Sequence, residues 1–169
     1  MKKVLGYLPL FVCALGVLAM MGLFMPAAEF AGETYSGWNI AIGYSETFEV
    51  LGNETKIKVC EFSVLNLAPY ILVAMGIACA VTLYKAGHAT KAAWSGALCF
   101  FAASLFFFVS PDFVRLSQDV EKALMNLGIK EIEVDLAFGA ILAGSVSIFA
   151  GVCMIVSNYL NPSKVALAR

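Results

Sequence analysis

The chain has 169 residues, of which 61% are hydrophobic and only 14% are charged, and its formal net charge is −1. Soluble domains average about 45–50% apolar and about 25% charged residues, so this composition excludes an ordinary soluble enzyme, a disordered chain and a nucleic-acid-binding domain. More than half of the chain lies in stretches without Asp, Glu, Lys or Arg, namely 4–28, 62–84, 92–111 and 136–163. The distribution predicts a small polytopic membrane protein with a single integral membrane domain.

Each charge-free stretch is long enough to cross a hydrocarbon core of about 30 Å as a helix. Backbone amides in lipid must be paired within the segment, so helix is the expected conformation. We predict a left-handed four-helix transmembrane bundle with spans at 4–25, 64–84, 92–109 and 136–158, and outer loops at 26–63 and 110–135.

The first span has a rival interpretation, because Lys2 and Lys3 followed by an apolar run resemble a secretory signal peptide. The run is longer than the apolar region of a signal peptide, and no clean small-x-small cleavage site follows it. We therefore expect a retained anchor.

The charges predict the orientation of the bundle. On one side, the segments that flank the spans contain only basic residues, Lys2, Lys3, Lys85, Lys91, Lys164 and Arg169, whereas all 12 acids lie in the two outer loops. Lys and Arg near span ends favour the cytoplasmic side. We expect a multi-pass protein of the cell membrane with both termini in the cytoplasm.

Alternating polarity in the first outer loop indicates β-structure. Residues 38–44 alternate partly, and residues 47–50 and 55–62 alternate around the turn residues 51–54. We predict a small extracytoplasmic β-sheet that covers Phe48, Val50, Ile57 and Val59. The candidate partner-binding residues on this outer face are Trp38, Tyr44, Phe48 and Cys60.

The second outer loop breaks at Pro111 and Asp112 and then reads as an amphipathic helix that ends near Gly128. Its predicted apolar face carries Val120, Ala123, Leu124 and Leu127. The net acidity of this helix argues against an anionic lipid surface, so we expect it to lie on the sheet.

Small residues recur every four positions along the fourth span, at Gly139, Ala143, Ser147 and Gly151. Such a stripe lets a neighbouring helix backbone approach closely in lipid, where no hydrophobic effect drives association. Packing within the bundle is the favoured interpretation, and a homodimer seam is the alternative.

The chemistry-bearing residues form no predicted catalytic, cofactor or metal site. Cys60 is the only cysteine in an outer loop, so it has no partner for a structural disulfide there and could pair with a second chain. The single histidine, His88, lies in the short inner loop, and the middle of every span lacks the ionisable residues of a proton-coupled transporter.

The layout, with a long sheet-like first outer loop that contains Trp38, resembles claudin-like tetraspan proteins. This loop has Gly37-Trp38 and Cys60 alone, without the Gly-Leu-Trp and paired cysteines of the claudin signature, so the resemblance implies no junction role. Tyr35-Ser36-Gly37-Trp38, Ile42-Gly43 and residues 62–67 are similar to small uncharacterised bacterial four-span membrane proteins, which imply no activity.

The favoured function is that of a non-enzymatic structural, accessory or partner-binding membrane protein that acts through its extracytoplasmic face. Besides the lipid bilayer, its expected partner is a membrane protein or a second copy, and not a nucleic acid. The alternative is a small channel or transporter for an uncharged solute, lined by Ser95, Ser104, Ser145 and Ser147. A membrane enzyme is the least favoured class, because no nucleophile–base pair is recognisable.

Overall fold

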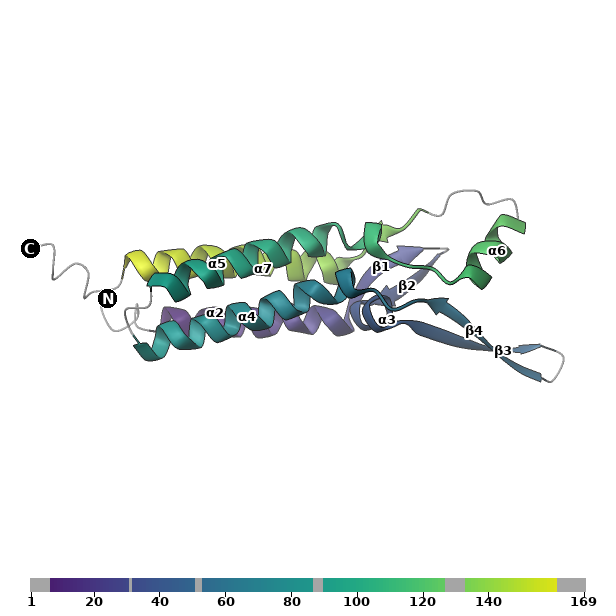
Figure 1. Cartoon of the computed structure of the whole chain (residues 1–169), viewed down its shortest axis with the longest axis horizontal. Coiled ribbons are helices and arrows are strands. Elements are labelled where there is room, and N and C mark those ends of the chain that lie inside the picture. The colour runs from purple at the N-terminus through teal and green to yellow at the C-terminus, as the bar shows by residue number, and fades with distance from the viewer. Residues whose placement is uncertain (1–6, 31, 51–52, 87–89, 127–132, 161–169) are drawn as a thin grey trace, which may run out of the picture.

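The structure is a computed structural model, and it describes residues 7–30, 32–50, 53–86, 90–126 and 133–160. The chain is mostly helical, with three long apolar helices and small antiparallel sheets. The long helices lie side by side at one end of an elongated molecule, and the strands form the other end, which we call the head (Figure 1).

Three helices are long and apolar enough to cross a membrane: α4 (Val64–Ala86), α5 (Thr90–Phe108) and α7 (Phe138–Tyr159). They confirm the predicted helices at 64–84, 92–109 and 136–158 to within a few residues. The first predicted span is shorter than expected, because α2 covers only Leu8–Met21 and continues as a 3-10 turn, η1 (Gly22–Phe24). The backbone becomes extended at Met25 and enters the first strand at Pro26, so the helix ends there.

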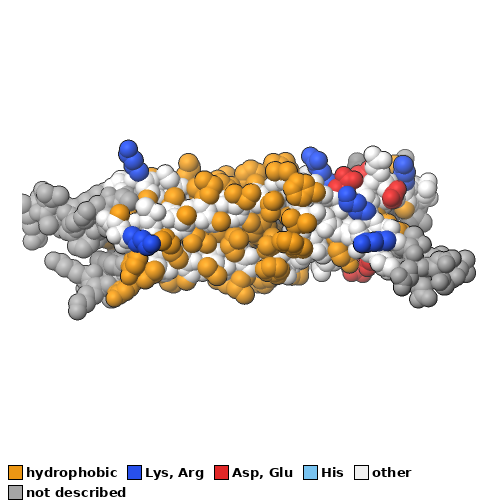
Figure 2. Space-filling model, turned by 60° about the horizontal axis from the view of Figure 1, so that its bottom comes forward, with side chains coloured by type: hydrophobic (Ala, Val, Ile, Leu, Met, Phe, Trp, Pro, Cys, Tyr) orange, Lys and Arg blue, Asp and Glu red, His pale blue; other side chains and the backbone are white. Residues whose placement is uncertain are grey.

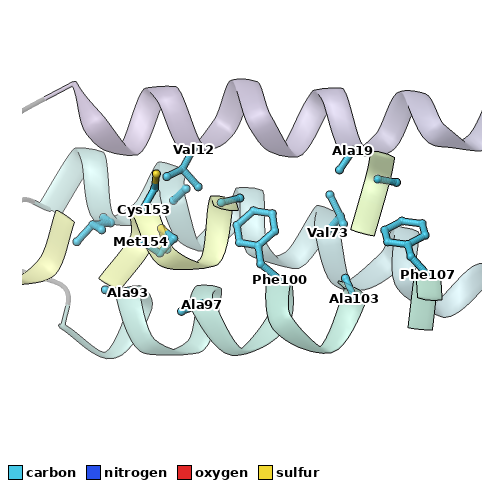
Figure 3. Close-up of a cluster of buried hydrophobic side chains, with 14 of the residues drawn as sticks. Val12, Ala19, Val73, Ala93, Ala97, Phe100, Ala103, Phe107, Cys153 and Met154 are labelled. Atoms are coloured by element: carbon cyan, nitrogen blue, oxygen red, sulfur yellow. The ribbon is translucent and has the colours of Figure 1, made fainter. Parts of the chain in front are cut away.

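The four helices pack in the order in which the chain makes them. α2 lies against α4 and α7, and α5 lies against the same two helices, so sequence neighbours are also spatial neighbours. The interior between them is filled by side chains that are almost fully buried (Figure 3), among them Val12, Val73, Phe100, Phe107 and Met154. A Cβ at Gly76 would lie only 2.8 Å from the Phe100 ring, so a glycine lets that ring fill the bundle axis.

The strands of the head come from both outer loops. β1 (Pro26–Phe30) pairs with β2 (Glu33–Ser36) on one side and with β5 (Asp135–Leu136) on the other, in the order β2-β1-β5. β3 (Tyr44–Val50) and β4 (Asn53–Cys60) form a separate antiparallel hairpin. The hairpin confirms the strands predicted at 47–50 and 55–62, and β1, β2 and β5 are strands that were not predicted.

The strand predicted at 38–44 is wrong, since residues Gly37–Ile42 form the helix α3. The Ser36 hydroxyl oxygen accepts a hydrogen bond from the Asn39 amide at 3.2 Å and so caps the start of this helix. Gly43 ends it with a φ of +100°, which residues with a Cβ rarely adopt.

The helix predicted in the second outer loop is confirmed as α6 (Gln118–Asn126), which lies against β4. Pro111 and Asp112 form the expected break, within the 3-10 turn η2 (Ser110–Phe113). On the predicted apolar face, Val120 is half-buried and Ala123 is exposed, while the side chains of Leu124 and Leu127 and the predicted stop at Gly128 lie outside the described residues. On the predicted covered face, Val59 is buried and Ile57 half-buried, and the side chains of Phe48 and Val50 are not described.

Candidate functional site

The head has its own hydrophobic core, separate from that of the helices. Its buried residues come from four strands or helices of the head and from the start of α7: Ala27, Ala28, Phe30, Tyr35, Ile40, Val59, Cys60 and Ala140. Val114 and Leu116 of the second outer loop pack against this core and are half-buried. The head is therefore a folded unit and not a pair of independent loops.

Hydrogen bonds join the segment 113–117 to the end of β4 and the start of α4. The Ser63 hydroxyl donates to the Phe113 carbonyl at 2.9 Å, and the Glu61 amide donates to the Arg115 carbonyl at 2.7 Å. The Ser117 amide donates to the Val59 carbonyl at 3.0 Å, and its hydroxyl donates to the Lys58 carbonyl. The two chain segments thus run side by side although they are far apart in the sequence.

Ser117 also caps the N-terminus of α6. The Ser117 hydroxyl oxygen accepts a hydrogen bond from the Val120 amide at 3.4 Å, and Asp119 and Glu121 place two carboxylates in the first turn. Both features stabilise a helix N-terminus, whose amides otherwise lack partners and whose dipole end is positive. α6 is therefore positioned through Ser117 relative to β4.

A groove of about 700 Å³ opens between η2, the segment 113–117 and α6. Apolar and charged side chains line it together, and the charged groups are three carboxylates and one guanidinium. Its lining residues are Glu61, Pro111, Asp112, Val114, Arg115, Leu116, Gln118, Glu121, Met125 and Val134. The half-buried Val114, Leu116 and Val134 continue from the head core, while Asp112, Arg115, Gln118, Glu121 and Met125 are exposed.

The predicted partner-binding residues differ in their exposure. Trp38 on α3 is 46% exposed, and Tyr44 at the start of β3 is half-buried. Phe48 lies on β3, and its side chain is outside the described part of the chain.

For Cys60, the structure corrects the prediction of an outer-face residue that could pair with a second chain. It is 0% exposed in the head core and forms a bridge with Leu116, so it is neither part of an exposed face nor accessible to a second chain. Burial raises the pKa of its thiol to about 11, which keeps it protonated and unreactive at neutral pH. The thiol is therefore a packing group in this fold.

The small-residue stripe of α7 is buried along its whole length. At the head end, a Cβ at Gly139 would lie 2.5 Å from the Pro26 carbonyl oxygen, and the Ala143 Cβ would be 2.8 Å from a Cβ at Gly22. Further along, Ser147 donates to the Ala143 carbonyl at 2.8 Å, and Gly151 faces the Phe101 ring of α5. These contacts lie within one chain.

The groove was missed in the sequence because its lining residues come from three separate stretches of the chain, namely Glu61, residues 111–125 and Val134. Arg115 and the alternation of Val114 and Leu116 around it were the available signal for an extended segment beside the sheet. Within the described ranges, no group of three or more His, Cys, Asp or Glu residues could hold a metal ion.

Comparison with known proteins gives no relative. No family model matches the chain, and no curated protein or solved structure is significantly similar to it. The resemblance to claudin-like tetraspan proteins and to small bacterial four-span proteins therefore stays a prediction.

Proposed function

We propose that the chain is a four-span protein of the cell membrane, with α2 and η1 as the first span. The helices α2, α4, α5 and α7 each carry exposed apolar side chains, and on the face that Figure 2 shows, hydrophobic side chains form a broad band over the middle of the molecule. The apolar helix Leu8–Phe24 extends for roughly 25 Å at about 1.5 Å per residue, which is close to the hydrocarbon thickness of about 30 Å.

Exposed tyrosine and tryptophan side chains support the position of the bilayer. At the end of the bundle opposite the head, each of the four helices has one of them: Tyr7, Tyr84, Trp94 and Tyr159. At the head end, the exposed aromatic residues are Trp38 and four phenylalanines, Phe24, Phe62, Phe108 and Phe138. Tyr and Trp concentrate at membrane–water interfaces, so the group opposite the head supports one edge of the hydrocarbon core there, and Trp38 supports the other edge at the head.

The described charges support an extracytoplasmic head. Lys85 and Lys91 flank the connection between α4 and α5 at the far end without any described acid, whereas all the described acids lie in the head, together with Lys56, Lys58, Arg115 and Lys122. The start of α2 and the end of α7 lie at the same end as these lysines (Figure 1). By the positive-inside rule, that end is cytoplasmic.

Within this architecture, the protein acts as a non-enzymatic accessory protein that binds a membrane-protein partner through the groove of the head. The observation that carries the proposal is the groove itself, which is lined by apolar side chains that pack against the head core and by exposed charged side chains. Protein interfaces have this anatomy, with an apolar centre and a polar rim.

The interior of the bundle favours this function over a channel for an uncharged solute. Phe100, Phe107 and Met154 occupy the space between the helices. Of the serines expected to line a pore, Ser104 and Ser147 donate to carbonyls of their own helices, and Ser95 and Ser145 are exposed on the outside of the bundle.

Site-specific photocrosslinking in native membranes tests the proposal. A photoreactive amino acid at Gln118 or Met125, on the edge of the groove, should trap the same protein, identified by mass spectrometry. The matched control carries it at Glu29, an exposed residue of β1 that does not line the groove. Glu121→Lys should reduce trapping from Gln118 severalfold, because it reverses a charge beside the site.

Equal trapping from Glu29, or trapping that Glu121→Lys leaves unchanged, would overturn a groove-directed interaction. A product that contains only this chain would identify the partner as a second copy.

A further inference from the structure

Two buried side chains at the junction of the bundle and the head have polar atoms without a hydrogen-bond partner among the described residues. Asn66, in the first turn of α4, is 2% exposed, and neither its amide nitrogen nor its amide oxygen is paired. Ser110, the first residue of η2, is 4% exposed, and its hydroxyl is also unpaired. Buried polar atoms nearly always have a partner, and an unpaired one costs free energy. These three atoms therefore point to a bound group.

Asn66 does not have the ordinary role of a polar side chain at this position of a helix. Ser63 caps α4, because its hydroxyl oxygen accepts a hydrogen bond from the Asn66 backbone amide at 3.4 Å. In a capping box, a side chain in the place of Asn66 would pair with the backbone amide of the capping serine. That amide donates instead to the Ala41 carbonyl at 3.0 Å. The Asn66 side chain therefore takes no part in capping.

Ser110 also differs from the buried serines of the bundle. The hydroxyls of Ser104 and Ser147 donate to carbonyls of their own helices. Ser110 follows the end of α5, where the chain turns into η2, and its hydroxyl pairs with no carbonyl of the described chain. Its hydrogen-bonding capacity is therefore available to a bound group.

Two contacts fix the register of α4 against α5 and η2. α4 and α5 are antiparallel neighbours, so a step forward along one corresponds to a step back along the other. On the head side, the Ser63 hydroxyl donates to the Phe113 carbonyl at 2.9 Å. On the bundle side, the rings of Tyr70 and Phe107 meet edge-on with their centroids 5.1 Å apart.

Asn66 and Ser110 lie at the level between these two contacts. Along α4, Asn66 comes three residues after the first contact, and on the other segment Ser110 lies three residues from each of them. Both side chains are buried at this level, so they face each other across the junction. Because they are not bonded to each other, their polar atoms are farther apart than a direct hydrogen bond.

We propose that ordered water fills this space and bridges the Asn66 amide and the Ser110 hydroxyl. Water both donates and accepts hydrogen bonds, so it pairs with all three atoms, and a buried water makes about three such bonds. A bridge of this kind is nearly as favourable as a direct hydrogen bond. The flanking contacts hold α4 close to η2, so the space suits a molecule as small as water. An ion is not favoured, because both side chains are uncharged and cannot neutralise it.

The bridge supports one wall of the groove. Pro111 and Asp112, which directly follow Ser110 in η2, line the groove. Water between Ser110 and Asn66 therefore anchors this wall to α4. The water site is built from Asn66 and Ser110 and does not depend on what the groove binds.

Magic-angle-spinning NMR of the whole chain in bilayers of deuterated lipid tests the site. The chain carries isotopically labelled asparagine, and magnetisation is transferred from water protons to the side-chain amides at short mixing times. We expect rapid transfer to the Asn66 amide, whose signal is assigned by its loss in Asn66→Leu. A soluble gadolinium chelate should leave this signal sharp and should broaden that of the exposed Asn126, because the bridging water is buried.

A matched pair of variants tests the bridge to the hydroxyl. Ser110→Val and Ser110→Thr add nearly the same volume, and only the threonine keeps the hydroxyl. Transfer to the Asn66 amide should fall severalfold in Ser110→Val and persist in Ser110→Thr. Absence of transfer in the wild-type chain, broadening of the Asn66 signal by the chelate, or equal transfer in the two variants would overturn the proposal.

Discussion

The serine hydroxyls of the helical bundle and of the head find their hydrogen-bond acceptors in opposite ways. In the bundle, the hydroxyls of Ser104 and Ser147 donate to carbonyls three or four residues earlier in the same helix. In the head, the hydroxyls of Ser63 and Ser117 donate to carbonyls at least 50 positions away in the sequence. The bundle serines therefore bond within their own helix, whereas the head serines bond to segments that are distant in the sequence.

The difference follows from the surroundings proposed for each region, lipid for the bundle and water for the head. A helix in lipid pairs its own backbone, so association between helices depends on shape and close contact. Short strands in water are marginal alone and gain stability only when several segments combine around a common core. We therefore expect the bundle to respond most to changes in volume and the head to changes in hydrogen bonding.

The largest effect should come from emptying the bundle axis. Phe100→Ala removes a ring that is 0% exposed and should reduce the free energy of unfolding by about 3 kcal/mol. Denaturation in mixed micelles measures the change. Leu105→Ala is the control, because Leu105 lies on the same helix and is 68% exposed, and it should change stability by less than about 0.5 kcal/mol. Equal losses in the two variants would contradict a shape-dependent interior.

Adding volume where the two regions meet should have the next largest effect. Gly139→Ala places a Cβ 2.5 Å from the Pro26 carbonyl oxygen, and this backbone contact should cost about 2 kcal/mol. Hydrogen exchange should accelerate at β1 in this variant and not in Ser145→Ala, which alters an exposed residue of α7. Unchanged exchange at β1 would show that α7 and β1 do not support each other.

Removing a long-range hydrogen bond should affect the head alone. Ser117→Ala deletes the donor to the Lys58 carbonyl and the cap of α6, at a cost of about 1 kcal/mol. Limited proteolysis should then cut α6 faster, while the bundle unfolds at the wild-type denaturant concentration. Gln118→Ala, at the next and exposed position, should leave both measurements unchanged. A bundle destabilised as much as α6 would contradict the separation of the two regions.

The smallest effect at neutral pH concerns Cys60. Its folded pKa of about 11 exceeds the ordinary value of 9.0, so the stability contribution of the neutral thiol is complete below pH 9 and is lost as the pH rises through 11. In a variant whose other cysteines are alanine, maleimide at pH 8 should label Cys60 at least about a hundredfold more slowly than in the unfolded chain. Rapid labelling of the folded protein would place the thiol at the surface.

The features that the sequence predicts well are local ones. The helices α4, α5 and α7 follow from the length of a charge-free run, which requires no knowledge of neighbours. The hairpin of β3 and β4 follows from alternation on both sides of a turn. α3 was missed because residues 38–44 alternate in polarity, while the Ser36 cap and the positive φ of Gly43 decide its conformation.

Most of the candidate site depends on contacts between distant segments. β5 has only two residues and becomes a strand through β1, about 100 positions earlier in the chain. Cys60 reads as an exposed loop residue, and it is buried because the segment around Leu116 covers it. No periodicity within either loop encodes these pairings, so the groove was not visible in the sequence.

The pairing of β5 with β1 has a consequence for how the protein is made. β5 directly precedes α7, and the Ala137 amide donates to the Ala27 carbonyl at 3.1 Å, so the last helix begins where the first sheet is completed. During synthesis, α2, α4 and α5 are made while one edge of β1 still lacks its partner. An exposed strand edge is a template for wrong pairing. Completion of the head therefore waits for the final part of the chain, and until then that edge of β1 stays open to wrong pairing.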